Sequence, residues 1–245
     1  MKKKIIIYII GFLLVIVVCV LFIRHIRLKN YMIKYNQRGI LLSFDDYNEK
    51  NWTEYFDLFD KYNVKVTFFV TLSEPTDFCA EAIKRGHEIG YHTAEHVNIT
   101  ELSEEECYQQ AIAPIEVFRS KGYELSSFAY PYGAYTEQLN EKLLQYYDTV
   151  RGAYKFEVRY KRSIQNGFVE SYPLDNISFK TDEEFLAKID ELLDVLINCE
   201  EGTIAPMYSH AIGEGDWCIT PRRLEMLFQE AEERDLVFYT FKELQ

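Results

Sequence analysis

The chain of 245 residues lacks acidic side chains at its start, C-x-x-C pairs and internal repeats. No Asp or Glu precedes position 31, so residues 31–245 carry all 39 acidic residues against 21 Lys and Arg residues. A surface this acidic disfavours nucleic acid and other polyanions as partners. The five cysteines form no C-x-x-C pair, which excludes a structural zinc knuckle. Cys19 lies in the apolar run near the start of the chain, and a disulfide between two of the other four cysteines is possible, although the sequence does not assign it.

Charge is also missing from residues 5–23, a run of nineteen residues flanked on both sides by Lys and Arg. Nineteen helical residues rise roughly 28 Å, about the thickness of a bilayer core. No small-residue cleavage site follows, and soluble helices rarely lack a polar face. We therefore expect one uncleaved transmembrane helix within residues 1–30, a juxtamembrane linker at 31–37 and a single domain at 38–245.

The orientation of this anchor follows from weaker signals. Basic residues at both ends give no clean answer by the positive-inside rule. The short basic head followed directly by the apolar run resembles a signal-anchor. We expect a single-pass protein of the cell membrane whose C-terminal domain lies outside the cytoplasm.

After residue 38, short apolar runs alternate with amphipathic segments, which predicts an α/β fold with parallel strands joined by right-handed crossovers. Seven or eight such units favour a distorted (β/α) barrel, in which chemistry sits at the C-terminal ends of the strands. The expected strands span 39–44, 64–70, 87–91, 127–130, 149–153, 177–179, 203–209 and 236–239, and the expected helices 52–62, 76–84, 103–121, 136–146, 182–198 and 221–233.

Two pairs of polar residues follow expected strands. Asp45 and Asp46 end the first strand, where adjacent carboxylates point in different directions, although such pairs more often begin a solvated turn. His92 and His96 follow another strand, and histidines four apart can meet one metal from a single helical turn. The chain has only five histidines, and this pair holds two of them.

Two further strand ends carry candidate residues. The loop Tyr130-Pro131-Tyr132-Gly133 follows one strand, where Pro fixes the turn and Gly permits a close backbone approach. His210 ends another, and a lone strand-end His is more often structural than catalytic. Together these residues meet at one barrel face. A His-His-Asp set with an open position suits a Lewis-acid metal that activates water, and a second carboxylate and another His remain for acid–base work.

The order SFDD, HTAEH, AYPYG and YSH resembles the polysaccharide deacetylase family, the NodB homology domain of carbohydrate esterase family 4, over about residues 38–242. The resemblance implies a barrel of about seven strands. It also implies that Asp45 is the catalytic base, that Asp46, His92 and His96 bind the metal, that the Tyr132 amide helps hold the oxyanion, and that His210 is the general acid.

The sequence departs from the family pattern in two places. Ala129 stands where members often have the Arg that steadies the base, and we expect Arg151, near the end of the next strand, to supply that charge. The usual Asp-Trp motif is absent. Asp175 is a candidate to orient His210, and Trp217 a candidate wall of the acetyl pocket beside Tyr130, Pro131 and Tyr132.

We therefore expect a metal-dependent hydrolase that removes N-acetyl groups from a cell-wall or secreted polysaccharide, acting on linear amides. Zinc is the first choice of metal on ligand softness, with cobalt, nickel or manganese able to substitute. An O-acetyl esterase, a non-sugar amidohydrolase and a catalytically silent glycan-binding membrane protein remain alternatives. The expected partners are an acetylated polysaccharide or oligosaccharide and the membrane; nothing implies a protein partner.

Overall fold

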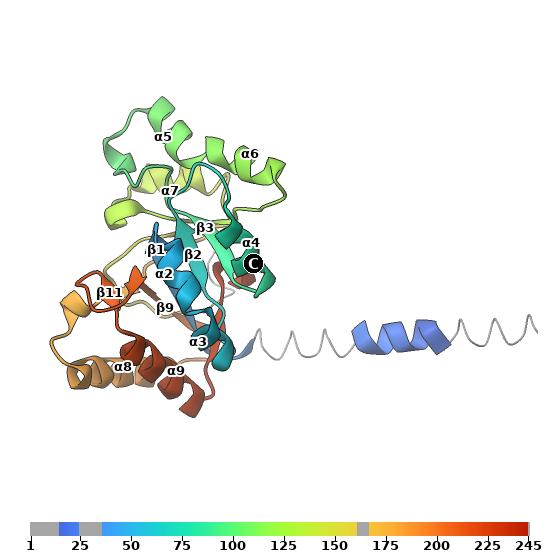
Figure 1. The fold of residues 1–245 in the computed structure, drawn as a ribbon, viewed down its shortest axis with the longest axis vertical. Helices are drawn as coiled ribbons and strands as arrows, with labels where there is room; N and C mark the ends of the chain where they lie inside the picture. Colours follow the sequence, from blue (N-terminus) through green and yellow to red (C-terminus); the bar gives the residue numbers. More distant parts are fainter. Residues whose placement is uncertain (1–14, 25–35, 161–166, 245) are drawn as a thin grey trace, which may run out of the picture. The chain divides into compact units, whose positions relative to one another are not determined.

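The computed structural model describes residues 15–24, 36–160 and 167–244 (Figure 1). The chain divides into two units, residues 1–37 and 38–245. In the first unit, residues 15–24 form a helix with exposed side chains. No helix of the described part combines the length and apolar character that a membrane span requires. The expected anchor at 5–23 and linker at 31–37 lie largely outside the described residues.

The second unit is built on one large sheet of ten strands in the order β6-β9-β1-β2-β3-β4-β5-β7, with β12 paired to β1 and β8 to β9. Every pairing in this sheet is parallel except that between β6 and β9. The strands are β1 Gly39–Asp46, β2 Thr67–Val70, β3 Glu88–Tyr91, β4 Ser127–Ala129, β5 Thr149–Arg151, β6 Arg159–Tyr160, β7 Phe168–Val169, β8 Tyr172–Pro173, β9 Thr203–Ser209 and β12 Val237–Tyr239.

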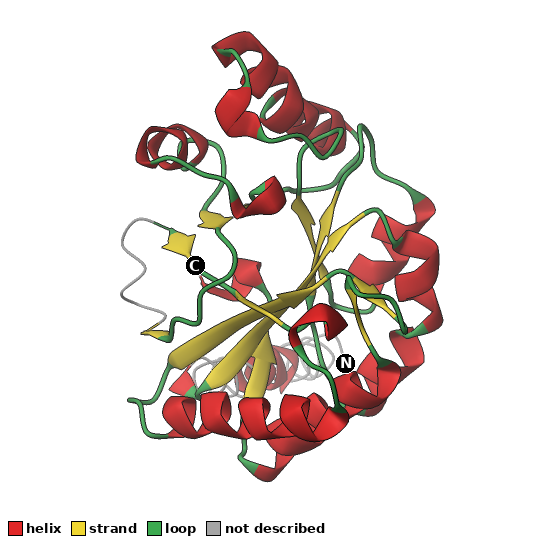
Figure 2. Cartoon of the chain, turned by 90° about the vertical axis from the view of Figure 1, so that its left-hand side faces the viewer, coloured by secondary structure: helices red, strands yellow, loops and turns green. Residues whose placement is uncertain are grey.

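Helices lie around the outside of this curved sheet (Figure 2). They are α2 Glu49–Glu54, α3 Phe56–Lys61, α4 Asp77–Lys84, α5 Glu104–Ala111, α6 Ala113–Ser120, α7 Glu137–Leu143, α8 Asp182–Ile197 and α9 Pro221–Glu233. After β9, the strands β10 Ala211–Ile212 and β11 Cys218–Ile219 form a separate two-stranded sheet. The α/β barrel-like architecture expected from the sequence is confirmed. The sheet has ten strands rather than about seven, because the short β6, β7 and β8, which were not expected, join it.

Alternation along the strands separates two apolar cores. In β1, Leu42 and Phe44 pack outward against the helices, whereas Leu41 packs inward in the barrel with Phe69 and Ala129. Ser103 and Glu106 form the expected capping box at the start of α5. The helix expected to continue to residue 121 is broken at Ile112, because Pro114 in the first turn of α6 lacks the N–H that a continuous helix needs.

Two other expectations about elements are wrong. The helix expected at 52–62 is divided at Tyr55 into α2 and α3. The strand expected at 177–179 is a 3-10 turn, Asn176–Ser178. There the Asn176 side chain donates hydrogen bonds to the carbonyls of Gly213 and Gly215, which tie the segment to the β10–β11 loop rather than to the sheet.

The N-terminal end of the barrel is closed by the 3-10 helix Phe241–Leu244. Buried Glu88 accepts hydrogen bonds from Thr67, from Ser127 and from the backbone of Lys242. Phe241 is fully buried in the inner core. The opposite end, where the strands finish, is therefore the one that can receive a ligand.

Candidate active site

A pocket of about 320 Å³ opens at the C-terminal ends of the strands. The barrel topology brings together side chains that lie far apart in the sequence, as the sequence analysis expected. The pocket is lined by Asp45, Asp46, His92, His96, Tyr130, Tyr132, Gly133, Arg151, Ala153, Tyr154, Tyr208, His210 and Trp217.

Asp46, His92 and His96 present a three-ligand set for a metal. Their ligand atoms all lie within 4.8 Å of one another. Asp46 Oδ1 is 3.4 Å from His92 Nε2 and 3.1 Å from His96 Nε2. His92 Nδ1 lies 2.8 Å from the Ala129 carbonyl, so it is the donor in that bond and Nε2 keeps its lone pair. Two imidazoles, one carboxylate and an open side are the donor set of catalytic zinc sites, so the residues fit the metal.

The backbone of this set differs from the single helical turn expected for the two histidines. Residues 92–96 form a loop in which Thr93 and His96 have left-handed φ values of 64° and 52°. Gln110 of α5 holds the loop: its carbonyl accepts from Ala94 N–H and its side chain from Glu95 N–H. Strained backbone of this kind persists where surrounding contacts impose it, and it gathers at functional sites.

The electrostatics of Asp46 favour its ionised form. Burial alone would raise its pKa, but the neighbouring His92, His96 and His210 hold the pKa well below its ordinary value. Asp46 also has a left-handed φ of 84° at the end of β1. The turn directs its carboxylate toward the histidines while Asp45 faces the barrel interior.

Asp45 and Arg151 form a buried ion pair inside the barrel. Arg151 Nη2 donates to Asp45 Oδ2, and both residues are almost completely buried. The guanidinium lies over the rings of Phe69 and Tyr208, at 5.3 and 4.6 Å from their centroids. The contact between Arg151 and Asp45 expected from the sequence is therefore present, through one nitrogen rather than two.

The register of the sheet explains how Arg151 reaches Asp45. Ala129 of β4 and Arg151 of β5 are partners in the parallel ladder, so they stand at the same height in the barrel. Ala129 is fully buried in the inner core and carries no group that could reach a carboxylate. The guanidinium therefore comes from β5, one strand away from position 129, and at the same height in the barrel.

His210 and Asp175 form a second hydrogen-bonded pair in the site. Asp175 Oδ2 accepts from His210 Nδ1 at 2.8 Å, and its Oδ1 accepts from Ser209 Oγ at 2.6 Å and from the His210 backbone N–H at 3.2 Å. Burial would lower the pKa of His210, but the bond to Asp175 and the nearby carboxylates outweigh it and raise the pKa. The contact between Asp175 and His210 expected from the sequence is therefore present.

The expected substrate-binding residues differ in their placement. Tyr132 and Trp217 are exposed at the pocket mouth. The ring centroid of Tyr132 lies 4.7 Å from that of His96, and the ring centroid of Trp217 lies 5.6 Å from that of His210. Tyr130 lines the wall with a buried ring, and burial raises the pKa of its hydroxyl. Pro131 is buried in the turn Pro131–Gly133 and is not part of the pocket wall. Tyr154, which belongs to none of the four sequence motifs, is a further exposed aromatic of the same rim.

Comparisons with known proteins agree with this geometry. The family model described as polysaccharide deacetylase matches residues 33–148. A peptidoglycan-N-acetylglucosamine deacetylase of Bacillus cereus is 35% identical over 109 residues, covering 42% of this chain and 39% of that protein. The peptidoglycan-N-acetylglucosamine deacetylase PgdA of Listeria monocytogenes is 32% identical over 115 residues, covering 45% and 24%. The chain therefore spans well under half the length of these relatives.

A solved structure has the same fold over most of the chain. It is a family 4 acetyl xylan esterase from Clostridium thermocellum in complex with a cobalt ion, 23% identical, with a TM-score of 0.59, covering 84% of this chain and 89% of that one. The likeness in fold covers more of the chain than the segment matched by the family model.

Proposed function

We propose that the chain, whose residues 33–148 match the polysaccharide deacetylase family model, hydrolyses N-acetyl groups of amino sugars in a cell-wall polysaccharide. The observation that carries the proposal is the convergence on one pocket of the Asp46-His92-His96 set, the Asp45–Arg151 pair and the Asp175–His210 pair. These groups supply metal binding, a base and an acid, which amide hydrolysis needs together.

A divalent metal held by Asp46, His92 and His96 would supply Lewis acidity and make water acidic enough to react near neutral pH. Zinc suits two imidazoles and a carboxylate, and cobalt, nickel or manganese can occupy the same donors. The bond between His92 Nδ1 and the Ala129 carbonyl fixes the ring for this task.

Asp45 acts as the base in this proposal. Its Oδ2 is held by Arg151, whereas its buried Oδ1 receives no hydrogen bond from the described residues. One oxygen is thus fixed, and the other can take the proton of the attacking water. The Tyr132 amide, in a tight turn with a left-handed φ of 59°, would donate to the oxyanion. One such donor contributes roughly 3–4 kcal/mol to transition-state stability.

His210 acts as the acid. Its Nδ1 is engaged by Asp175, so Nε2 is the nitrogen that can deliver a proton to the departing amine. Its raised pKa keeps it protonated to higher pH than an ordinary histidine. Acetate and a free amino sugar are the products. Trp217, Tyr132 and Tyr154 offer exposed rings on which sugar rings can stack.

The direct test is acetate release by the purified domain 38–245 from N-acetylated and O-acetylated glycans, with and without added zinc. We expect metal-dependent release from N-acetylglucosamine polymers, and chelation should abolish it. Release from O-acetyl xylan alone would instead favour the esterase alternative, a reading that the fold shared with an acetyl xylan esterase keeps open. A silent binding protein, the third reading, would release no acetate from either.

We also propose that residues 5–23 anchor the protein in the cell membrane with the barrel outside the cytoplasm, where cell-wall glycan lies. The support is the charge-free run of nineteen residues with basic flanks. Fractionation of cells that express the full chain, followed by protease treatment of intact spheroplasts, tests the proposal. Recovery in the soluble fraction, or protection from protease, would contradict it.

A further inference from the structure

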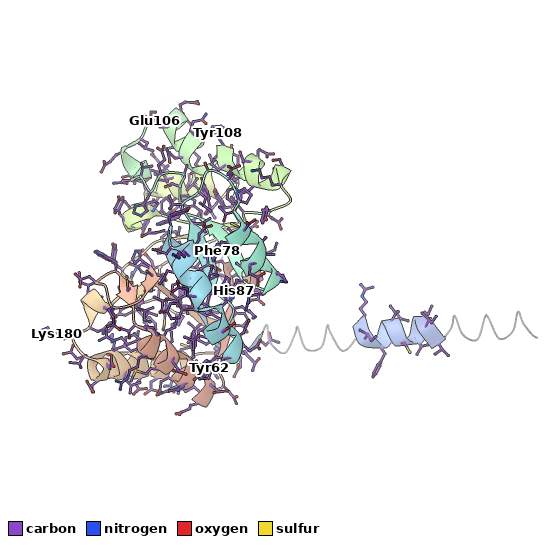
Figure 3. The ribbon with its side chains drawn as sticks, viewed as in Figure 1. Tyr62, Phe78, His87, Glu106, Tyr108 and Lys180 are labelled. Atoms are coloured by element: carbon purple, nitrogen blue, oxygen red, sulfur yellow. The ribbon has the colours of Figure 1, made fainter. Side chains whose placement is uncertain are left out.

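The short helix α2, which follows the Asp45–Asp46 pair by three residues, is hydrogen-bonded to the segment that carries His210. Trp52 is completely buried and its indole Nε1 donates to the His210 carbonyl at 2.7 Å. Its ring packs against Phe68 of β2 and Phe78 of α4, with centroids 5.0 and 5.6 Å away (Phe78 is labelled in Figure 3). Trp52 therefore joins the outer core to the backbone of the proposed acid.

Asn51 makes a second connection beside the first. Its Nδ2 donates to the Ile212 carbonyl at 2.9 Å, and its Oδ1 accepts from the Ile212 N–H at 2.8 Å. A side-chain amide that pairs with both backbone groups of one residue fixes that residue in position and direction. Ile212 is itself buried, two residues after His210.

These contacts complete the surroundings of His210. Asp175 binds its backbone N–H and its ring, Trp52 binds its carbonyl, and Asn51 holds the chain two residues later. His210 lies between β9 and β10, outside the long parallel ladder. Strand pairing fixes the backbone at Asp45 and Asp46, whereas these side-chain hydrogen bonds fix the backbone at His210. Buried hydrogen bonds of this kind fix geometry as well as adding stability.

We propose that Asn51 and Trp52 are positioning residues that set the distance between His210 and the Asp45–Asp46 pair. The inference rests on the proposed function for what His210 does, and on the contacts of α2 for how it is held. Residues 45–52 would then contain the base, one metal ligand and the two residues that position the acid. A shift of His210 by about 1 Å would be enough to slow proton delivery by up to roughly 100-fold.

The test uses Asn51→Leu and Trp52→Phe in the metal-loaded domain 38–245, whose core is separate from residues 1–37. Asn51→Leu keeps the size of the side chain and removes both bonds, and Trp52→Phe removes the N–H. We expect kcat to fall roughly 10- to 100-fold with little change in KM or in metal content. In NMR spectra of histidine-labelled protein, the sharp wild-type signal of His210 should broaden or split in both variants.

Two control variants separate positioning from a general loss of stability. Phe78→Leu leaves a gap against the Trp52 ring but keeps the bond to the His210 carbonyl. Asn198→Leu removes a comparable side-chain bond, to the Asp194 carbonyl, on distant α8. Both should keep the wild-type kcat and the His210 signal.

The proposal is overturned by a wild-type kcat and His210 signal in both test variants. It is also overturned if they lose metal or unfold together with their activity, or if Phe78→Leu lowers kcat as much as Trp52→Phe. A wild-type domain that releases no acetate would refute the proposed function, and the NMR comparison would still decide whether α2 positions His210.

Discussion

The two oxygens of Asp45 have different surroundings, whereas Asp46 shares one oxygen between two histidines. Arg151 occupies Oδ2 of Asp45, and Oδ1 is left for a proton. Oδ1 of Asp46 is the atom nearest to both His92 and His96. These different surroundings fit the separate tasks proposed for the two neighbouring carboxylates, and the difference can be measured.

Asp45→Asn and Asp46→Asn are expected to fail in different ways. Asp45→Asn should keep its metal and lose turnover by about 10²- to 10⁴-fold, because only the base is removed. Asp46→Asn should lose metal affinity, and His96→Ala should behave in the same way. Metal analysis after dialysis, together with single-substrate kinetics, distinguishes them. Equal metal loss in both Asp variants would show that the roles within the pair are wrongly assigned.

If His210 is the acid, we expect Asp175 to set the pH range over which it can donate a proton. Burial lowers the pKa of His210, but Asp175 and nearby carboxylates raise it overall, so the protonated form persists to higher pH than usual. Asp175→Asn removes the charge and keeps the shape. The pKa of His210 should fall, and the alkaline limb of the kcat profile should move to lower pH, because His210 must be protonated to donate.

The pH profiles of wild type and Asp175→Asn, measured at saturating metal, test this expectation. Ser209→Ala is a matched control, since it removes a neutral partner of the same carboxylate. An alkaline limb that stays in place in Asp175→Asn would mean that another group supplies the proton.

At the scale of elements, the parallel sheet explains why the residues of the site could be predicted from the sequence. Strands that alternate with helices end on one side, so Asp45, His92 and His210 could be assigned to one face before any coordinates were known. The strand ends were predicted to within a few residues because each is a buried apolar run. The two histidines were wrongly given a helical turn, because the contact of their loop with Gln110 is not local.

Other features could not be predicted because they depend on pairings between distant segments. The position of β12 beside β1 and the bonds from Asn51 and Trp52 to the His210 segment join residues more than 150 positions apart. Single sequences carry no periodic signal for such contacts. The 3-10 turn at Asn176–Ser178 was mistaken for a strand because its apolar residues resemble one, whereas its side-chain bonds decide its shape.

The ladder partners Ala129 and Arg151 allow a test of position against charge. Arg151→Ala should lower kcat by about one to three orders of magnitude while metal content stays the same, because Asp45 loses its fixed partner. The double variant Ala129→Arg with Arg151→Ala places an arginine at the same height on β4 and should regain part of the loss. Arg151→Lys should recover less, since an ammonium lacks the planar fork and the stacking on Tyr208.

Steady-state kinetics and metal analysis of the three variants decide the matter, at a temperature where thermal denaturation shows each to be folded. This condition is needed because an unpaired buried Asp45 also costs stability. Wild-type kcat in Arg151→Ala would refute the assignment of Arg151 as the partner of the base.

At the scale of the whole molecule, one end of the barrel is closed by packing and the other end carries the pocket. Glu88, buried among Thr67, Ser127 and the Lys242 amide, closes the end opposite to the pocket. Burial raises the pKa of Glu88, and four hydrogen bonds to its carboxylate compensate in part. This buried titrating group therefore lies at the opposite end of the barrel from those proposed for catalysis.

His87 gives the clearest expectation about stability and pH. Its ring stacks on Phe56, and its Nδ1 accepts from the Val66 N–H at 3.2 Å. Burial first, and then the charge of Lys65, lower its pKa to about 4. In the unfolded chain the pKa of His87 is near 6.5. Between about pH 4 and pH 6.5, His87 therefore binds a proton in the unfolded chain but not in the folded protein. Stability should therefore fall as the pH drops from about 6.5 to 4, by up to about 3 kcal/mol from this residue.

His87→Asn keeps an acceptor for the Val66 N–H but cannot be protonated in this range. Its free energy of unfolding at neutral pH should be lower than that of wild type, because the ring contacts with Phe56 and Phe59 are lost. Its decline between pH 7 and pH 4.5 should be shallower, since one proton-linked contribution is gone. Urea denaturation at the two pH values measures both quantities, and the difference of the slopes is independent of the packing loss. Parallel slopes in wild type and variant would mean that His87 does not govern the acid sensitivity of the barrel.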